Sequence, residues 1–142
     1  MLGREGFRRL AYAEWGPSNA ARTDVCLHGL SRSGRAFDTL ASAMAEQGER
    51  AVPPALPERG CGEWLESLVH YTDCAYTRAM SALIARLDVE QVDRVGTSLA
   101  RHVGIMPAAR AGEVTTVQIV GCGHAPALMN DAQVAVVQAF VS

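Results

Sequence analysis

Short apolar runs that predict β-strands alternate along the chain with longer stretches that predict helices. The strand candidates are residues 9–14, 25–28, 51–56, 92–95 and 114–120. The helix candidates are residues 34–46, 71–87, 99–110 and 127–140. Such alternation is typical of a parallel sheet with helices on its faces. We therefore expect an α/β fold with a mostly parallel central sheet of about five strands flanked by helices.

The helix candidate at residues 71–87 has the clearest pattern. Its apolar residues recur at intervals of three and four, which places them on one face of a helix. We expect this face to be buried. Its members are Tyr76, Met80, Leu83, Ile84 and Leu87.

Prolines weaken two of the other elements. Pro53 and Pro54 lie inside the strand candidate at residues 51–56, and proline cannot donate a hydrogen bond to a strand ladder. We therefore expect that strand to be frayed or to lie at an edge of the sheet. Pro107 removes a backbone donor deep in the helix candidate at residues 99–110 and should kink or shorten it.

Length and composition indicate one domain that covers residues 1–142. With 49% hydrophobic residues the chain has enough apolar material for a real core. A net charge of -2 provides no basic field of the kind that nucleic-acid-binding proteins use. No apolar run approaches the roughly 18 residues of a membrane span, and no secretory signal is recognisable. We therefore expect a cytoplasmic protein that binds neither nucleic acid nor membrane.

The pentapeptide Gly96-Thr97-Ser98-Leu99-Ala100 lies between a strand candidate and a helix candidate. A strand, a tight turn with small residues on both sides of a serine, and a helix together make a nucleophile elbow. Such a turn exposes the serine hydroxyl at the carboxyl end of its strand. The first amides of the following helix then point toward developing negative charge.

Two further strand ends carry residues that such a serine would need. The strand candidate at residues 25–28 ends in His28 and is followed by Gly29, a place where a hydrolase supplies a second oxyanion amide from its backbone. His124 follows the strand candidate at residues 114–120 and lies downstream of the serine. His28 could itself be a second catalytic base, but we favour a role in fixing the loop through hydrogen bonds to the backbone.

The chain resembles an α/β-hydrolase fold protein of the esterase/lipase type. The matching stretches follow the order of that family and are residues 9–16, 27–38, 89–98 and 123–129. The resemblance implies that Ser98 is the nucleophile and His124 the general base, with the amides of Leu30 and Leu99 in the oxyanion hole. It implies a carboxylic ester hydrolase without a cofactor. Short-chain or activated esters are favoured because no lid covers the acyl pocket, and a lactone is an alternative substrate.

The segment that carries the catalytic acid in this family is absent from the sequence. Two strands, a lid and the acid-bearing loop should lie between the helix after Ser98 and the strand before His124. Asp88, Asp93 and Glu113 lie at the wrong ends of their elements. The acidic residues expected on the correct side are Glu63, Glu66 and Asp131. A slow Ser-His dyad remains chemically reasonable, because binding and the oxyanion hole retain much of the acceleration.

The shortened chain has two further interpretations. It could be a catalytically impaired relative that persists as a binding or assembly module, and Arg101, where a glycine usually lies, favours this alternative. A missing strand would also leave an open sheet edge, which tends to recruit another chain. A homodimer formed by edge pairing or strand exchange is therefore an alternative to a monomer.

The four cysteines give no sign of a metal site, because they lack C-x-x-C spacing. Cysteines in or beside buried strands usually pack as small apolar residues. Cys122 lies two residues from His124 and would be a reactive thiol if exposed, although we favour a packed side chain there too.

Overall fold

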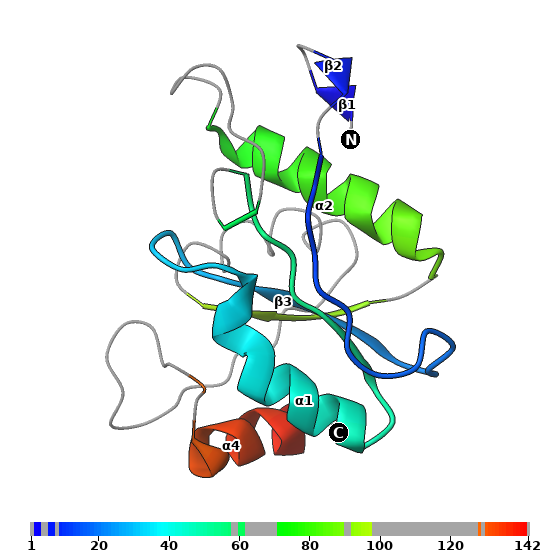
Figure 1. Cartoon of the computed structure of the whole chain (residues 1–142), viewed down its shortest axis with the longest axis vertical. Helices are drawn as coiled ribbons and strands as arrows, with labels where there is room; N and C mark the ends of the chain where they lie inside the picture. Colours follow the sequence, from blue (N-terminus) through cyan, green and yellow to red (C-terminus); the bar gives the residue numbers. More distant parts are fainter. Residues whose placement is uncertain are drawn as a thin grey trace.

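A three-stranded parallel sheet forms the centre of the protein (Figure 1). The computed structural model describes residues 2–3, 6–7, 9–57, 60–61, 71–89, 92–97, 128 and 130–141. The strands of the sheet are β3 (Thr23–Leu27), β4 (Arg50–Val52) and β5 (Asp93–Gly96). Their spatial order is β4-β3-β5, with both pairs parallel. Two short strands, β1 (Leu2–Gly3) and β2 (Gly6–Phe7), pair with each other in antiparallel orientation.

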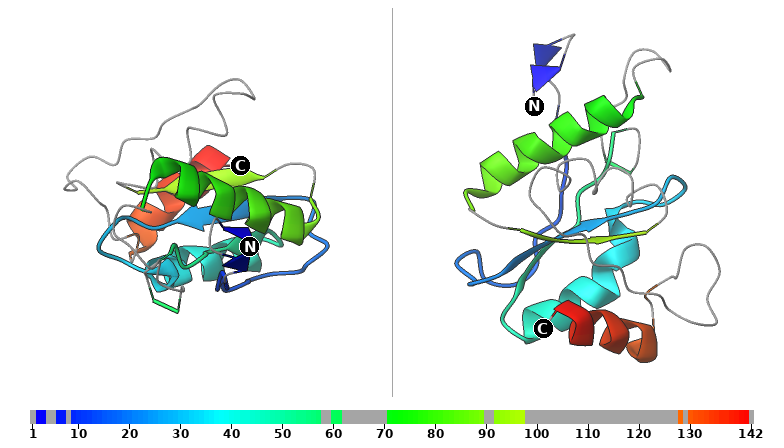
Figure 2. Two further views of the ribbon diagram at one scale, coloured as in Figure 1. Left: turned by 90° about the horizontal axis from the view of Figure 1, so that it is seen from above. Right: turned by 180° about the vertical axis from the view of Figure 1, so that it is seen from behind.

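Helices cover both faces of this sheet (Figures 1 and 2). A 3-10 turn, η1 (Gly34–Phe37), and helix α1 (Asp38–Glu46) connect β3 to β4. Helix α2 (Asp73–Leu87) lies on the opposite face, and helix α4 (Asp131–Val141) packs beside α1. The chain passes from β3 to β4 and then back across β3 to β5. Since parallel crossovers are right-handed, reversing the direction of travel puts α1 and α2 on opposite faces.

The central strand β3 is buried along its whole length. Val25 and Leu27 belong to the core cluster beneath α2. Cys26 points the other way, into the cluster formed with α1 and α4. This alternation follows the two-residue period of a strand, and burial on both faces is typical of a parallel sheet.

The expectation of about five strands is wrong for the part of the chain that the structure describes, where the parallel sheet has three. Residues 9–14 are not a regular strand. Tyr12 and Trp15 instead form isolated antiparallel bridges to Pro54 and Ala51. Regular pairing cannot continue there because Pro53 and Pro54 have no N–H to donate. The strand expected at residues 114–120 lies outside the described residues.

The prolines also explain the length of β4. This strand ends at Val52, directly before Pro53 and Pro54. Pro53 takes part in the backbone pairing through its carbonyl, which accepts from the N–H of Ala13 at 3.1 Å. The expected fraying of this strand is therefore confirmed.

Helix α2 confirms the expected amphipathic pattern. Its buried residues include Tyr76, Met80, Leu83 and Leu87, whereas Ile84 is half-buried at the margin of the face. The Thr72 hydroxyl caps the helix by accepting from the N–H of Ala75 at 3.3 Å.

Helix α4 begins four residues later than the pattern of residues 127–140 predicts. The side chain of Asn130 accepts a hydrogen bond from the N–H of Gln133 at 2.9 Å. The Gln133 side chain reaches back to accept from the N–H of Leu128 at 2.9 Å. The Asn130 side chain thus caps the helix, and the Gln133 side chain ties its first turn to the residues before it, which fixes the helix start at Asp131. Apolar periodicity alone does not reveal where such a cap forms.

The helix candidate at residues 34–46 is confirmed, although its first turn is the tighter η1. The helix expected at residues 99–110 lies outside the described residues. Among the helices that the structure describes, none has the length and hydropathy needed to cross a membrane.

Candidate functional site

The carboxyl ends of β3 and β5 lie side by side. Leu27, the last residue of β3, pairs with Gly96, the last residue of β5. The N–H of Thr97 then donates to the Leu27 carbonyl at 3.2 Å. The chain leaves β3 toward β4, on the side away from β5. Ligands of open α/β sheets bind outside carboxyl ends at such a point, where neighbouring strands diverge.

His28 fixes the loop that follows β3. Its ring is completely buried. Nε2 accepts from the N–H of Leu56 at 3.1 Å, and Nδ1 lies 2.8 Å from the carbonyl of Gly29. These partners require a neutral ring protonated on Nδ1. The geometry supports the loop-fixing role and leaves no ring nitrogen free to act as a base.

The loop beyond His28 turns sharply and presents Leu30. The N–H of Arg32 donates to the Gly29 carbonyl at 3.2 Å, which closes a four-residue turn. Leu30 is 55% exposed, which is unusual for a leucine in this chain, whose core leucines are almost fully covered. An exposed apolar side chain at this end of the sheet is suited to contact with the apolar part of a ligand.

Gly34 holds this loop against the residues that follow β4. A Cβ added at Gly34 would lie 2.8 Å from the backbone oxygen of Pro53 and 3.0 Å from that of Pro54. The start of η1 can therefore approach the two prolines only because residue 34 has no side chain.

The sequence analysis named six further site residues, and five of them lie outside the described residues. These are Ser98, Leu99, His124, Glu63 and Glu66. The described range 92–97 ends at Thr97, one residue before Ser98. The structure therefore positions the segment that leads to the predicted nucleophile, and the roles of all five residues remain predictions.

Asp131 is the exception. It is the first residue of α4 and is exposed to solvent. A carboxylate in this position interacts favourably with the helix dipole, which gives Asp131 a structural role independent of catalysis. Helix α4 begins on the side of the molecule where β3 and β5 end (Figures 1 and 2). Its proposed role as triad acid remains a prediction.

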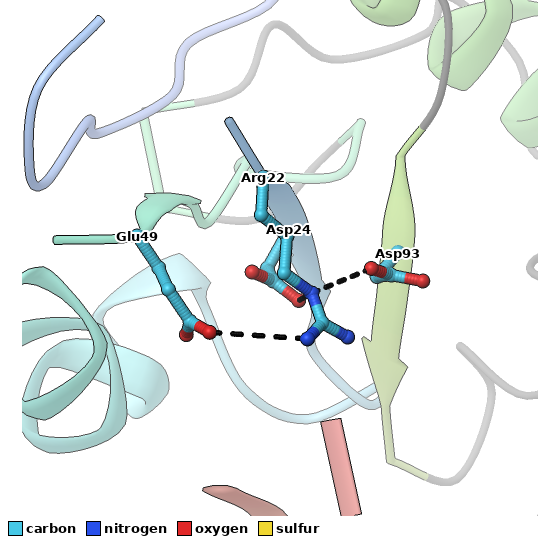
Figure 3. A network of polar contacts seen from close by, with 4 residues as sticks. All are labelled: Arg22, Asp24, Glu49 and Asp93. Atoms are coloured by element: carbon cyan, nitrogen blue, oxygen red, sulfur yellow. Dashed lines mark hydrogen bonds and ion pairs between the residues drawn. The ribbon is translucent and has the colours of Figure 1, made fainter. Parts of the chain in front are cut away.

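The amino-terminal edge of the sheet carries an ionic network that the sequence analysis missed. Arg22 lies there among three carboxylates, those of Asp24, Glu49 and Asp93 (Figure 3). Asp93 begins β5, so its expected position at the end opposite the site is confirmed. The sequence pattern did not predict a buried Asp24, because charged residues are rare in buried strands. Two-residue periodicity extended backward from Cys26 could have found it.

The described cysteines differ in burial. Cys26 is fully buried, and burial together with the charge of Asp24 raises the pKa of its thiol. Cys61 and Cys74 are exposed. Within the described ranges no cluster of three or more His, Cys, Asp or Glu residues could hold a metal ion. Cys122 lies outside those ranges.

Comparison with known proteins gives hydrolases in sequence and in structure. No family model matches the chain. A curated relative, the 3-hydroxybutyrate-oligomer hydrolase of Cupriavidus necator, is 46% identical over 100 residues, which are 70% of this chain and 34% of the relative. The chain thus spans about a third of the length of this relative.

Solved structures with the same fold cover a similar share of the chain. A thioesterase domain from the curacin biosynthetic pathway matches with a TM-score of 0.67 and 25% identity over 73% of this chain and 38% of its own. An epoxide hydrolase from Vigna radiata matches with a TM-score of 0.63 and 30% identity over 67% of this chain and 29% of its own. A haloalkane dehalogenase from Paraglaciecola agarilytica matches with a TM-score of 0.72 over 78% of this chain and 37% of its own. At 22% identity this match supports the fold alone. With its parallel sheet, flanking helices and loops at the carboxyl ends of β3 and β5, the chain belongs to the α/β-hydrolase fold superfamily.

Proposed function

We propose that this chain is a carboxylic ester hydrolase that uses Ser98 as its nucleophile. The observation that carries the proposal is the hydrogen bond between Thr97 and Leu27. It holds the residue before Ser98 against the strand that leads into the His28-Gly29-Leu30 loop. A serine elbow and an oxyanion loop are needed side by side for acyl transfer.

In the proposed reaction the Ser98 hydroxyl attacks the ester carbonyl and His124 accepts the hydroxyl proton. The amides of Leu30 and Leu99 stabilise the oxyanion of the tetrahedral intermediate. His124 then returns the proton to the leaving alcohol, which leaves an acyl group on Ser98. A water molecule, deprotonated by His124, releases the acid and restores the serine.

The proposed substrates are short-chain or activated esters. The substrate in the name of the curated relative is an oligomer of 3-hydroxybutyrate, a short hydroxy acid whose units are joined through ester bonds. The exposed Leu30 supplies apolar surface for a short acyl group beside the proposed oxyanion hole. A lactone would use the same groups, because its carbonyl is also an ester carbonyl.

Hydrolysis of p-nitrophenyl acetate by Ser98→Ala and by the matched control Ser81→Ala tests the proposal. Ser81 is exposed in the middle of α2, far along the chain from the loops of the site. We expect Ser98→Ala to lose at least about a thousandfold in kcat, as nucleophile removal does in triad enzymes. Ser81→Ala should keep the wild-type rate. Turnover that survives in Ser98→Ala would show that another group carries the reaction.

The second candidate function is that of a binding or assembly module without catalysis. It is favoured by Arg101, which lies where this family usually has a glycine, and by the short interval between Ser98 and His124, which leaves out the acid-bearing segment. A fluorophosphonate probe separates the two functions, because only an activated serine reacts with it. Labelling at Ser98 supports the esterase, and an intact chain that stays unlabelled supports the module.

A further inference from the structure

Three carboxylates surround the guanidinium of Arg22, which forms a hydrogen bond with one of them (Figure 3). Its Nε donates to Asp93 Oδ2 at 2.7 Å, a short charge-assisted hydrogen bond. The same Nε lies 4.0 Å from Asp24 Oδ1, and Nη1 lies 3.9 Å from Glu49 Oε1. Arg22 is therefore bonded to Asp93, while Asp24 and Glu49 are within the range of ion pairs but beyond hydrogen-bond distance.

Asp24 is the buried member of this network. It has no accessible surface, and both its carboxylate oxygens lack a hydrogen-bond partner among the described residues. Its cross-strand neighbour Asp93 is about half exposed, with 53% of its side chain accessible. When ionised, the buried carboxylate of Asp24 loses its hydration without gaining a hydrogen-bond donor in return, so the protonated form of Asp24 is favoured.

The charged groups around Asp24 act in opposite directions. The pKa of its carboxyl is raised to about 6, chiefly by burial and also by the negative charges of Glu49 and Asp93. The positive charge of Arg22 lowers the pKa but does not offset the burial. The arrangement in which Arg22 bonds Asp93 thus suits a neutral Asp24.

We propose that Arg22, Asp24 and Asp93 form a proton-controlled exchange at the amino-terminal edge of the sheet. While Asp24 holds its proton, Arg22 stays bonded to Asp93. When that proton passes to solvent, the new charge on Asp24 draws the guanidinium across a gap that is already only 4.0 Å, and the bond to Asp93 breaks. Glu49 remains within ion-pair range of Arg22 and steadies it in both arrangements.

The exchange would loosen one end of the β3–β5 pair. Arg22 precedes β3 and Asp93 begins β5, so their hydrogen bond joins the two strands through side chains. The backbone pairing from Asp24–Asp93 to Leu27–Gly96 does not depend on it. The expected change is therefore local, and the carboxyl ends of the strands keep their register.

NMR titration of the whole chain tests this exchange. We expect the Asp24 carboxyl carbon to titrate near pH 6 and the Nε–H resonance of Arg22 to shift with the same midpoint. Asp93→Asn removes a negative charge and leaves Arg22 only a neutral competing acceptor, so the Asp24 midpoint should fall by about one pH unit. Glu46→Gln, which removes an exposed carboxylate at the end of α1, should leave both curves unchanged.

The variant Asp24→Asn should abolish the Arg22 transition, because the amide does not titrate. An Asp24 carboxyl that titrates near pH 4, or an Arg22 resonance that does not follow Asp24, would overturn the proposal. If Asp24→Asn does not fold, the wild-type and Asp93→Asn curves still decide the question.

Discussion

The two ends of strand β3 bury polar side chains in opposite ways. At the carboxyl end, His28 is fully covered and each ring nitrogen has a backbone partner. At the amino end, Asp24 is equally covered, yet neither oxygen has a hydrogen-bond donor in the described part of the chain. The first arrangement costs little and gives the oxyanion loop one fixed conformation. In the second arrangement the ionised Asp24 carboxylate is unfavourable, and protonation removes its charge.

The carboxyl end of β3 is therefore fixed by hydrogen bonds, whereas its amino end can respond to a change in pH. The end that is expected to hold a reacting carbonyl needs loops that do not move when the solvent changes. The opposite end has no such requirement. A titrating group can therefore lie there without disturbing the proposed site.

The largest effect is expected from breaking the fixed end. His28→Ala leaves the N–H of Leu56 without its ring partner, removes one of the two hydrogen bonds to the Gly29 carbonyl and opens a cavity, so we expect a loss of about 3–5 kcal/mol in the free energy of unfolding. Urea unfolding measures this loss. His28→Gln, whose side-chain oxygen can accept from Leu56, should recover part of it. Equal losses in both variants would mean that the ring acts through its shape alone.

The next effect sharpens the contrast by changing pH. The pKa of Asp24 lies near 6 in the folded chain, above its ordinary value of 3.8. Its stabilising contribution is therefore complete below about pH 4 and is lost as the pH rises through 6. One pH unit corresponds to about 1.4 kcal/mol, so wild type should lose about 3 kcal/mol relative to Asp24→Asn between pH 3.5 and 7.5.

Thermal unfolding of both proteins across this pH range measures the difference. Other carboxyl groups titrate in both chains and cancel in the comparison. A difference in stability that stays constant with pH would contradict the assignment of the titrating group to Asp24.

A smaller effect is expected from the close approach at the carboxyl end. Gly34→Ala places a methyl group against the backbone oxygens of Pro53 and Pro54 and should cost about 1–3 kcal/mol. Gly48→Ala is the matched control. Its site has open space but a φ of +83°, so only the backbone strain of about 1 kcal/mol is expected. Chemical denaturation measures the loss in the free energy of unfolding for each variant. A smaller loss in Gly34→Ala than in Gly48→Ala would show that η1 can move away from the two prolines at little cost.

The smallest effect concerns helix capping on the two faces of the sheet. Thr72→Ala removes the cap of α2, and Asn130→Ala removes the cap of α4. Each should lower the free energy of unfolding by about 1 kcal/mol. Asn130→Asp should keep most of the stability, since a carboxylate also caps and suits the helix dipole. A full loss in that variant would point to the Gln133 and Leu128 contacts instead.

Sequence patterns predicted the elements whose formation depends on local periodicity. The spacing of Tyr76, Met80, Leu83 and Leu87 predicted the buried face of α2 because a helix repeats every 3.6 residues. The two prolines after Val52 predicted the early end of β4 for an equally local reason. The resemblance to α/β-hydrolases came from short motifs at strand ends, and the comparisons confirm it.

Patterns failed where the outcome depends on what packs against a segment. Residues 9–14 have the alternation of a strand, but the partner they meet includes Pro53 and Pro54, so only isolated bridges form. The start of α4 was placed too early because the side chains of Asn130 and Gln133 end the preceding loop. The roles of Ser98, His124 and the triad acid remain predictions from the sequence.

The sequence by itself determined the fold superfamily, the order of the elements and the faces that helices bury, because these follow from chain periodicity and short motifs. Only the tertiary structure decided that His28 would satisfy both ring nitrogens and that Asp24 would satisfy neither oxygen. Hydrogen-bond satisfaction depends on donors and acceptors brought together from distant parts of the chain: Leu56 donates to His28, whereas Arg22 donates to Asp93 instead of Asp24. A one-dimensional pattern records which residues are polar, whereas their partners exist only once the chain has folded.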